Sequence, residues 1–285
     1  MSVSTTIDPY AVLVELGIER PTRVEAVTGG SATSMWRVEH DSATYALRVF
    51  RPDQTSLCKH EVQVMAVARE RGIPVPTVHR QGIWQERQVL LLSWMPGDTI
   101  QNVVMRQPWR IFALGVSFGQ MQAKLHRATT SNALDDGWMR WHGFNDMALQ
   151  NRLRALSTNT CLLHLDFHPA NVMVKGNEIS AVLDWTNAKI GDARADYART
   201  YTILAVEPIP QAPRYIGWLR TIITKSWQRG YHEVAGIPAD MDAFYAWAGE
   251  VMLLDLAPRI GKDFVEKDFD GMRRWIAKKR QGVAV

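Results

Sequence analysis

The stretch that decides the fold is LLHLDFHPANVMV at residues 162–174, followed by AVLDW at residues 181–185. It contains Asp166, then Asn171 five residues later, and then Asp184 thirteen residues after that. A carboxylate, an amide and a second carboxylate therefore follow one another at fixed distances along the chain.

The chain between Asn171 and Asp184 predicts a β-hairpin. Two apolar runs, at 172–174 and 179–183, surround a Lys-Gly-Asn turn at 175–177. Asp184 is expected at the end of the second strand. A further apolar run, 161–163, predicts a buried strand that ends just before Asp166.

These residue types suit phosphoryl transfer. One carboxylate must face the acceptor hydroxyl, and Asp166, on a turn after a strand, is placed to accept its proton or to orient its O–H bond. Asn171 and Asp184 provide the oxygen ligands that Mg²⁺ prefers. The sequence therefore predicts Asp166 as the catalytic residue and Asn171 and Asp184 as metal ligands.

A transition-metal site is the alternative interpretation of the same loop. His164, Asp166 and His168 alternate as HxDxH, a pattern compatible with metal ligation. This interpretation leaves Asn171, the hairpin and Asp184 without a role, and the other histidines are scattered singly along the chain. We therefore expect His164 to brace the loop and His168 to belong to a rigid turn.

The motifs together resemble the signature of the aminoglycoside phosphotransferase family, whose relatives include choline and homoserine kinases within the protein-kinase-like fold. The similarity lies in residues 164–171, in Asp184-Trp185 and in GDARAD at 191–196, where Ala193 replaces the usual proline. It implies that Asp166 is the catalytic aspartate and that Asn171 and Asp184 bind metal. It also implies that Asp196 braces the loop from the start of a helix.

The N-terminal part predicts a glycine-containing flap over a nucleotide. Residues 24–28, 34–38 and 44–50 have the pattern of strands, and GGSAT at 29–33 joins the first two. Gly30 and Ser31 would offer N–H and hydroxyl donors to phosphate oxygens. Because the stretch lacks G-x-G-x-x-G, an ordinary hairpin turn is the alternative.

The resemblance also implies a cation on the third strand, where the family usually has lysine. Here it is Arg48, with Glu61 as its expected partner on an apolar-periodic helix from about residue 56 to residue 71, which Gly72 and Pro74 end. A guanidinium is larger than an ammonium group and binds in a bidentate manner, so the two are not equivalent. The alternative is a surface arginine and a solvated glutamate.

A hinge is implied after the strand at 88–92. In the family, backbone groups there hold adenine, and the matching positions are the carbonyl of Ser93 and the N–H of Met95. Side chains contribute little to this kind of recognition, so these two assignments depend on the resemblance alone.

Composition sets limits on the class of protein. The chain has 285 residues, of which 46% are hydrophobic, enough for two lobes with their own cores. Its two cysteines, Cys58 and Cys161, lie in different expected elements, which favours a reducing cytoplasm over a disulfide framework. We find no targeting signal and no apolar stretch long enough to span a membrane, so no membrane partner is expected.

The formal net charge of +4 does not indicate a nucleic-acid partner. Residues 1–95 carry ten basic and ten acidic side chains, whereas residues 231–270 carry nine acidic and three basic ones. Five basic residues in the last fifteen account for part of the excess and predict a solvated, basic end of a C-terminal helix.

The expected fold is α+β and two-lobed, of the protein-kinase-like type. An antiparallel-sheet, nucleotide-binding lobe would span residues 1–95, and a larger, mainly helical lobe with the catalytic and acceptor-binding residues would span 96–285. The expected function is transfer of phosphate from ATP, with Mg²⁺, to a hydroxyl of a small molecule. A protein-kinase role is disfavoured because only a few residues separate Asp184 from the Gly191-Asp192 turn, leaving no activation segment.

The acceptor is expected to be an aminoglycoside or another amino-bearing compound, because residues 231–270 are acidic. The acidic residues that would suit such an acceptor are Asp240, Asp242, Glu250, Asp255, Asp263 and Glu266. A solvated acidic face is the alternative, and macrolides, choline, homoserine and sugars stay open as acceptors. A catalytically weak nucleotide-binding pseudokinase is the alternative from another class. The sequence makes no prediction of the oligomeric state.

Overall fold

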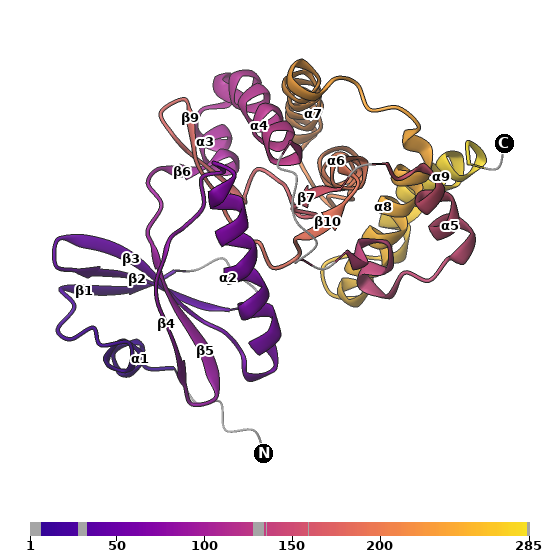
Figure 1. Cartoon of the computed structure of the whole chain (residues 1–285). Coiled ribbons are helices and arrows are strands. Elements are labelled where there is room, and N and C mark those ends of the chain that lie inside the picture. The colour runs from indigo at the N-terminus through magenta and orange to yellow at the C-terminus, as the bar shows by residue number, and fades with distance from the viewer. Residues whose placement is uncertain (1–6, 28–32, 128–133, 135, 159, 284–285) are drawn as a thin grey trace.

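The computed structural model of the protein describes residues 7–27, 33–127, 134, 136–158 and 160–283. An antiparallel sheet and a mainly helical region lie side by side (Figure 1). The sheet has five strands in the order β1-β2-β3-β5-β4. Their bounds are β1 (Arg23–Ala26), β2 (Ser34–His40), β3 (Ala43–Val49), β4 (Val78–Trp84) and β5 (Arg87–Ser93).

One helix covers each face of this sheet. Side chains alternate along a strand, so Leu47 and Val49 of β3 pack with α1 (Pro9–Glu15), while the preceding Ala46 faces the other side and packs with α2 (Thr55–Glu70). The predicted strands at the start of the chain and the helix carrying Glu61 are therefore present. Neither α1 nor β4 was predicted from the sequence; β4, with the sequence VHRQGIW, is an edge strand whose residues are all exposed or half-buried.

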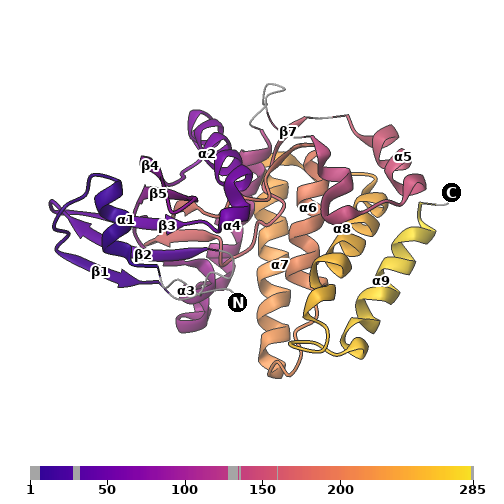
Figure 2. The same cartoon turned by 90° about the horizontal axis from the view of Figure 1, so that it is seen from below.

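The second region is built from helices and two small sheets. Its helices are α3 (Ile100–Arg106), α4 (Ile111–His126), α5 (Met147–Leu156), α6 (Ala193–Tyr201), α7 (Arg214–Ala235), α8 (Met241–Leu256) and α9 (Asp270–Gln281). The α7, α6, α8 and α9 helices lie next to one another (Figure 2). Short helical turns join them: η2 (Pro108–Arg110), η3 (Gly137–Gly143), the π-helix η4 (Thr202–Val206), η5 (Ala257–Arg259) and η6 (Glu266–Phe269). A further turn, η1 (Pro52–Gln54), lies between β3 and α2.

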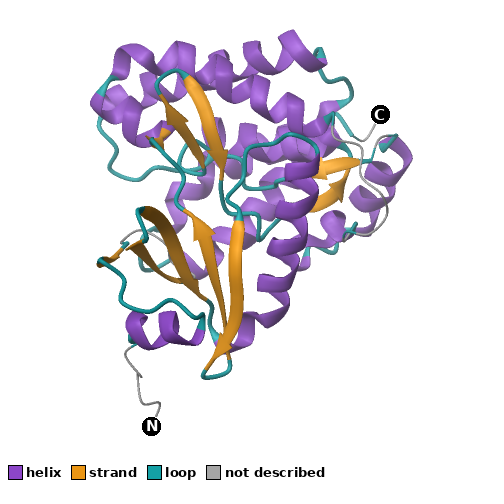
Figure 3. Ribbon diagram, turned by 60° about the vertical axis from the view of Figure 1, so that its left-hand side comes forward, coloured by secondary structure: helices purple, strands orange, loops and turns teal. Residues whose placement is uncertain are grey.

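The predicted hairpin is present as β8 (Val172–Lys175) and β9 (Glu178–Val182), with β6 (Asp98–Thr99) beside β8. The strand before Asp166 is β7 (Cys161–Leu163), which pairs with β10 (Lys189–Gly191). The hairpin lies against the helices, with its turn away from the large sheet and its open end toward that sheet (Figure 3). It thus carries the residues after Asn171 to the boundary between the two regions.

The α4 and α7 helices are held in close contact by glycine. A Cβ atom at Gly119 would overlap the carbonyl oxygen of Trp227, so any larger residue would push the helices apart. Helix α7 is thereby fixed against α4, and one wall of the cavity described below is fixed with it.

The basic end of α9 is only partly solvated, so that prediction was incomplete. Lys279 lies 2.7 Å from Asp242, and Arg280 lies 2.7 Å from Glu250 and 2.8 Å from Asp146. These ion pairs join α9 to α8 and to the start of α5. They also use two of the acidic side chains that the sequence had suggested for an acceptor.

In the described part of the chain, no helix combines the length and the apolar character that crossing a membrane requires.

Candidate active site

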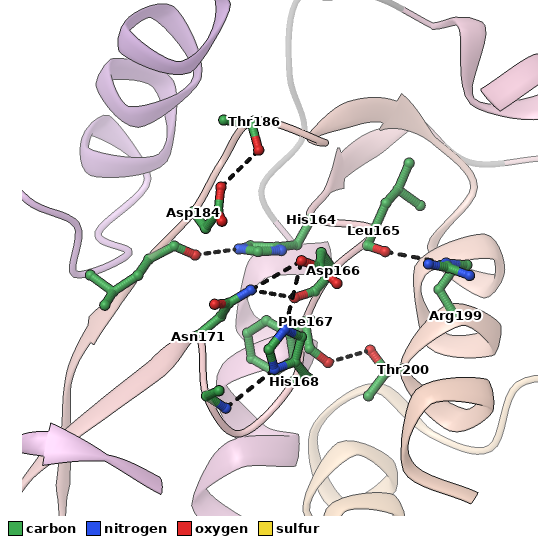
Figure 4. A network of polar contacts seen from close by, with 12 residues as sticks. His164, Leu165, Asp166, Phe167, His168, Asn171, Asp184, Thr186, Arg199 and Thr200 are labelled. Atoms are coloured by element: carbon green, nitrogen blue, oxygen red, sulfur yellow. Dashed lines mark hydrogen bonds and ion pairs between the residues drawn. The ribbon is translucent and has the colours of Figure 1, made fainter. Parts of the chain in front are cut away.

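The loop that follows β7 has a strained backbone that is held on both sides. Leu165 has a φ of 62°, in the left-handed region, and its N–H donates to Asp196 Oδ1 at 2.6 Å. The carbonyl of Leu165 accepts from Arg199 Nε at 3.3 Å (Figure 4). Helix α6 therefore fixes the residue immediately before Asp166 through both its polar backbone atoms.

Asp196 is fully buried, and both oxygens of its carboxylate form hydrogen bonds. Besides Leu165, its carboxylate bonds His126 Nε2 at 2.8 Å and Gln122 Nε2 at 3.2 Å. Burial acts to raise the pKa of Asp196, but the hydrogen bonds and the charges of nearby histidines outweigh it and lower the pKa. This geometry supports the loop-bracing role that the resemblance implied.

Asp166 lies next to His168 and Asn171 (Figure 4). Burial acts to raise the pKa of Asp166, but His168, with the charges of His164 and Arg199, outweighs it and lowers the pKa to about 2. The His168 ring lies 3.6 Å from the carboxylate. Burial acts to lower the pKa of His168, and the opposing effect of Asp166 raises it overall. Asp166 is thus ionised at neutral pH and paired with an imidazole that favours its cationic form.

Asn171 is oriented by Asp166. Its amide nitrogen donates to the backbone carbonyl of Asp166 at 3.0 Å and to Oδ2 at 3.2 Å. The amide oxygen consequently points away from Asp166, on the side of Asp184 (Figure 4). The hydrogen bonds leave this oxygen available as a ligand.

Asp184 lies at the end of β9 in a left-handed conformation, with a φ of 58°. Its side chain is 43% exposed, and Oδ1 accepts a hydrogen bond from the hydroxyl of Thr186 at 2.7 Å. A non-glycine residue in this conformation is uncommon, and such strain is concentrated at functional sites. The backbone thus presents an accessible carboxylate beside the amide of Asn171.

The predicted pair between Arg48 and Glu61 is present. Arg48 Nη1 lies 2.6 Å from Glu61 Oε1, Nη2 lies 4.0 Å from Asp184 Oδ1, and Nε donates to the Thr33 hydroxyl at 3.0 Å. Glu61 is 1% exposed, and this burial raises its pKa against the opposing charge of Arg48. The alternative of a surface arginine and a solvated glutamate is therefore wrong.

Of the other residues predicted to bind nucleotide, the structure describes Ser93 and Met95 but not Gly30 and Ser31. Ser93 ends β5, and its hydroxyl accepts from Thr77 N–H at 2.8 Å and donates to the sulfur of Met95 at 3.5 Å. Both residues lie on the segment that leads from the sheet to β6, where a hinge was predicted. Gly30 and Ser31 lie outside the described residues.

The alternative metal site is not formed by the loop histidines. His164 is buried, bonds the carbonyl of Leu183 at 2.9 Å and packs on Trp185, whereas His168 lies against Asp166. Among the residues that the structure describes, no group of three or more histidine, cysteine, aspartate or glutamate side chains has the arrangement of a metal site.

A cavity of about 720 Å³ opens beside Asp166 and His168. Its walls come from α3, the start of α4, η4, α7 and the end of α8. Of the acidic residues suggested between 231 and 270, only Asp255 lines it. The other five lie outside this cavity, and several of them form ion pairs on the surface.

Sequence reasoning missed Arg199 and Glu207. Arg199 is 1% exposed and lies between the Leu165 carbonyl and Asp255, whose carboxylate is 3.5 Å away. One signal was present, since Arg199 follows Asp196 by one turn of a helix and so shares its face. Glu207 lines the cavity after η4, in a segment without a motif.

A family model for the phosphotransferase enzyme family (APH) matches residues 23–157 and 140–237. Among curated protein sequences, none matches the chain. Several solved structures share its fold at low sequence identity.

An aminoglycoside phosphotransferase, APH(4)-Ia, in a ternary complex with AMP-PNP and hygromycin B is 16% identical, with a TM-score of 0.64 and 96% of each chain covered. A putative fructosamine-3-kinase from Haemophilus somnus 129PT is 14% identical, with a TM-score of 0.64 over 95% of this chain and 96% of that one. The macrolide 2'-phosphotransferase MphH from Brachybacterium faecium is 19% identical, with a TM-score of 0.54 over 97% of this chain and 95% of that one.

These likenesses confirm the two-lobed, kinase-like fold, and the family model covers most of the chain, including Asp166, Asn171 and Asp184. The chain therefore belongs to the phosphotransferase enzyme family.

Proposed function

We propose that this enzyme transfers the γ-phosphoryl group of ATP to a hydroxyl of a small molecule. The observation that carries the proposal is the position of Asp166. On one side it bonds Asn171, which adjoins Asp184, and on the other side it lines the cavity of about 720 Å³. A cavity of this size suits a small-molecule ligand.

ATP would bind between the sheet and the helical region, in lobes divided near residues 95 and 96. Arg48 would contact phosphate oxygens while Glu61 holds its guanidinium, and the backbone of Ser93 and Met95 would hold adenine. Gly30 and Ser31 would cover the phosphates. Support comes from the presence of the Arg48–Glu61 pair and from the AMP-PNP complex of the APH(4)-Ia structure, which shares the fold.

The donor set near Asp184 fits Mg²⁺. Asn171 and Asp184 offer one amide oxygen and one carboxylate, and a backbone hydrogen bond from Leu183 N–H to the Asn171 carbonyl at 2.8 Å holds their segments together. Mg²⁺ is commonly held by one or two such ligands together with phosphate and water oxygens. When bound, the ion would neutralise charge on the phosphates. Asn171 and Asp184 would hold it.

The transfer step follows from the position and the charge of Asp166. The acceptor oxygen forms a bond to the γ-phosphorus, the bond to the oxygen that bridges the β- and γ-phosphates breaks, and ADP leaves. With a pKa of about 2, Asp166 is a weak base. We infer that it mainly orients the acceptor O–H bond, and that the proton passes through it to solvent as the new bond forms.

The test combines a binding and a transfer measurement. Calorimetry with ATP should show Mg²⁺-dependent binding, and a screen of hydroxyl compounds with labelled ATP should identify phosphorylated products. Binding without transfer to any acceptor would favour the pseudokinase alternative. Failure to bind ATP would contradict the proposed function itself.

A further inference from the structure

The cavity beside Asp166 is mostly apolar. Thirteen of its twenty-one lining residues are isoleucine, leucine, valine, methionine or proline. Two of them, Met105 on α3 and Ile209 after η4, are 54% and 47% exposed. Large apolar side chains that face a cavity and stay half-exposed are suited to a ligand with an apolar surface.

The cations of the cavity already have partners in the protein. Arg220 donates to the backbone carbonyls of Leu204, Glu207 and Ile203 at 2.8, 2.9 and 3.2 Å. Arg259 lies 2.9 Å from Asp263, and its guanidinium covers the ring of Phe264. Contacts within the protein occupy both guanidinium groups, so the cavity is not arranged to bind a strongly anionic acceptor.

The carboxylates form one small polar group. The charge of the buried Arg199 guanidinium acts on Asp255, Asp166 and Glu207, and Arg220 and Arg259 also act on Glu207. Asp255 keeps 40% of its side chain exposed. Arg199, Arg220 and His168 offset these three carboxylates, so the polar end has no large negative excess and does not suit a ligand with several cationic groups.

We propose that the acceptor is an amphipathic hydroxyl compound with at most one amino group. Its hydroxyl end would lie against Asp166, Glu207 and Asp255, and its apolar body would lie against the wall formed by α3, η4 and α7. This assignment depends on the proposed phosphotransferase function, and it makes Glu207 and Asp255 the residues that determine acceptor specificity. It departs from the polycationic amino sugar suggested by the acidity of residues 231–270.

Binding of alkyl glycosides without nucleotide tests the apolar wall separately from catalysis. The probes are methyl, butyl and hexyl 2-amino-2-deoxyglucosides, measured by calorimetry, with hygromycin B as the polycationic probe. Burying the added methylenes should raise affinity roughly twofold to fourfold for each one. The hexyl compound should thus bind at least about thirtyfold more tightly than the methyl compound and more tightly than hygromycin B.

Two matched variants on α7 test whether the dependence of affinity on alkyl chain length comes from the apolar wall. Ile216→Ser removes a lining side chain and should reduce the gain from chain length several-fold, whereas Ile222→Ser, on the same helix but outside the cavity, should leave it unchanged. Equal effects in both variants, or no dependence on chain length in the unmodified enzyme, would overturn the proposal.

Replacing the amino group tests the polar end. Hexyl 2-amino-2-deoxyglucoside should bind several-fold more tightly than hexyl glucoside, and Glu207→Gln and Asp255→Asn should each reduce that ratio. Glu233→Gln, an exposed change elsewhere on α7, should keep it. An unchanged ratio in both cavity variants would remove these residues from acceptor recognition.

Transfer from labelled ATP, measured in parallel, separates the two proposals. Rapid phosphorylation of hygromycin B with no response to chain length would disprove the acceptor class and leave the kinase function standing. Absence of ATP binding would disprove the kinase function, and the calorimetric series would still decide what the cavity accepts.

Discussion

The two sides of Asp166 are built in different ways. On the nucleotide side, polar groups come from short stretches of chain with fixed spacing, and they meet in ion pairs and hydrogen bonds such as that between Arg48 and Glu61. On the acceptor side, the wall is apolar and is drawn from α3, η4, α7 and α8, which are far apart in the sequence. In the proposed function, local motifs would therefore fix the transfer chemistry, whereas the choice of acceptor would depend on how distant helices pack.

The largest effect is expected at the point where the two sides meet. Asp166→Asn keeps the shape of the side chain but removes the anion that orients the acceptor, so kcat should fall roughly a hundredfold or more. Calorimetry should show nearly unchanged ATP binding. A variant with near-normal kcat would show that Asp166 is not the catalytic residue.

A change on the nucleotide side should alter binding as well as turnover. Asp184→Ala removes the anionic ligand, so Mg²⁺-dependent ATP affinity should fall about tenfold or more. Thr186→Ala is the matched control, because it removes only the hydrogen bond to Asp184 Oδ1 and should have a smaller effect. Titration with Mg²⁺ that gives the same curve for Asp184→Ala and the unmodified enzyme would contradict the metal assignment.

Arg48 combines a structural and a binding role, and two variants separate them. Arg48→Met leaves Glu61 buried without its cation and should cost about 3 kcal/mol of stability, and it should raise the KM for ATP. Adding Glu61→Met should restore stability but not ATP binding. If Arg48→Met leaves the KM for ATP unchanged, Arg48 has no nucleotide role; Arg48→Lys should retain substantial activity if only a cation is required.

The sequence predicted well how the residues of the proposed nucleotide side are arranged. Asp166, Asn171 and Asp184 lie within one loop and one hairpin, so their spacing almost determines their arrangement. Arg48 and Glu61 were paired through the resemblance, and the structure shows the pair. The bracing of Leu165 by Asp196 could also be anticipated, since Asp196 belongs to the same set of motifs.

The acceptor side could not be predicted in the same way. Composition showed that residues 231–270 are acidic, but not that Asp242 and Glu250 pair with Lys279 and Arg280 on α9. Charge along a sequence does not say which carboxylates find a cation after folding. Glu207 has no motif, and its place in the cavity follows only from the packing of η4 against α7.

The pH dependence of kcat should change when His168, the residue beside Asp166, is replaced. The pKa of Asp166 is depressed to about 2, so the free energy from its ionisation is present above its usual pKa and is lost only as the pH falls toward 2. His168→Gln removes the partner that lowers this pKa. The acid limb of the kcat profile should therefore move to higher pH, with only a several-fold loss near neutral pH; an unmoved limb would show that His168 does not control the ionisation of Asp166.

The smallest effect is expected for a carboxylate outside the cavity. Asp242 is bound to Lys279, so Asp242→Asn should change the acceptor KM by less than about twofold at low and at physiological salt. Asp255→Asn is the comparison within the cavity and should raise the acceptor KM more. A large, salt-dependent effect of Asp242→Asn would restore the prediction of a broadly acidic acceptor site.

Arg48 also determines which chemical labels can report on this enzyme. Nucleotide reagents that carry a reactive acyl group depend on a nearby amine to take up that group. A guanidinium stays protonated and is a poor nucleophile under the same conditions, so Arg48 would not be acylated in its proposed place beside the phosphates. Surveys that detect kinases by acylation of a phosphate-contacting lysine would therefore not find this enzyme through that position, whereas competition by free ATP in a binding assay would.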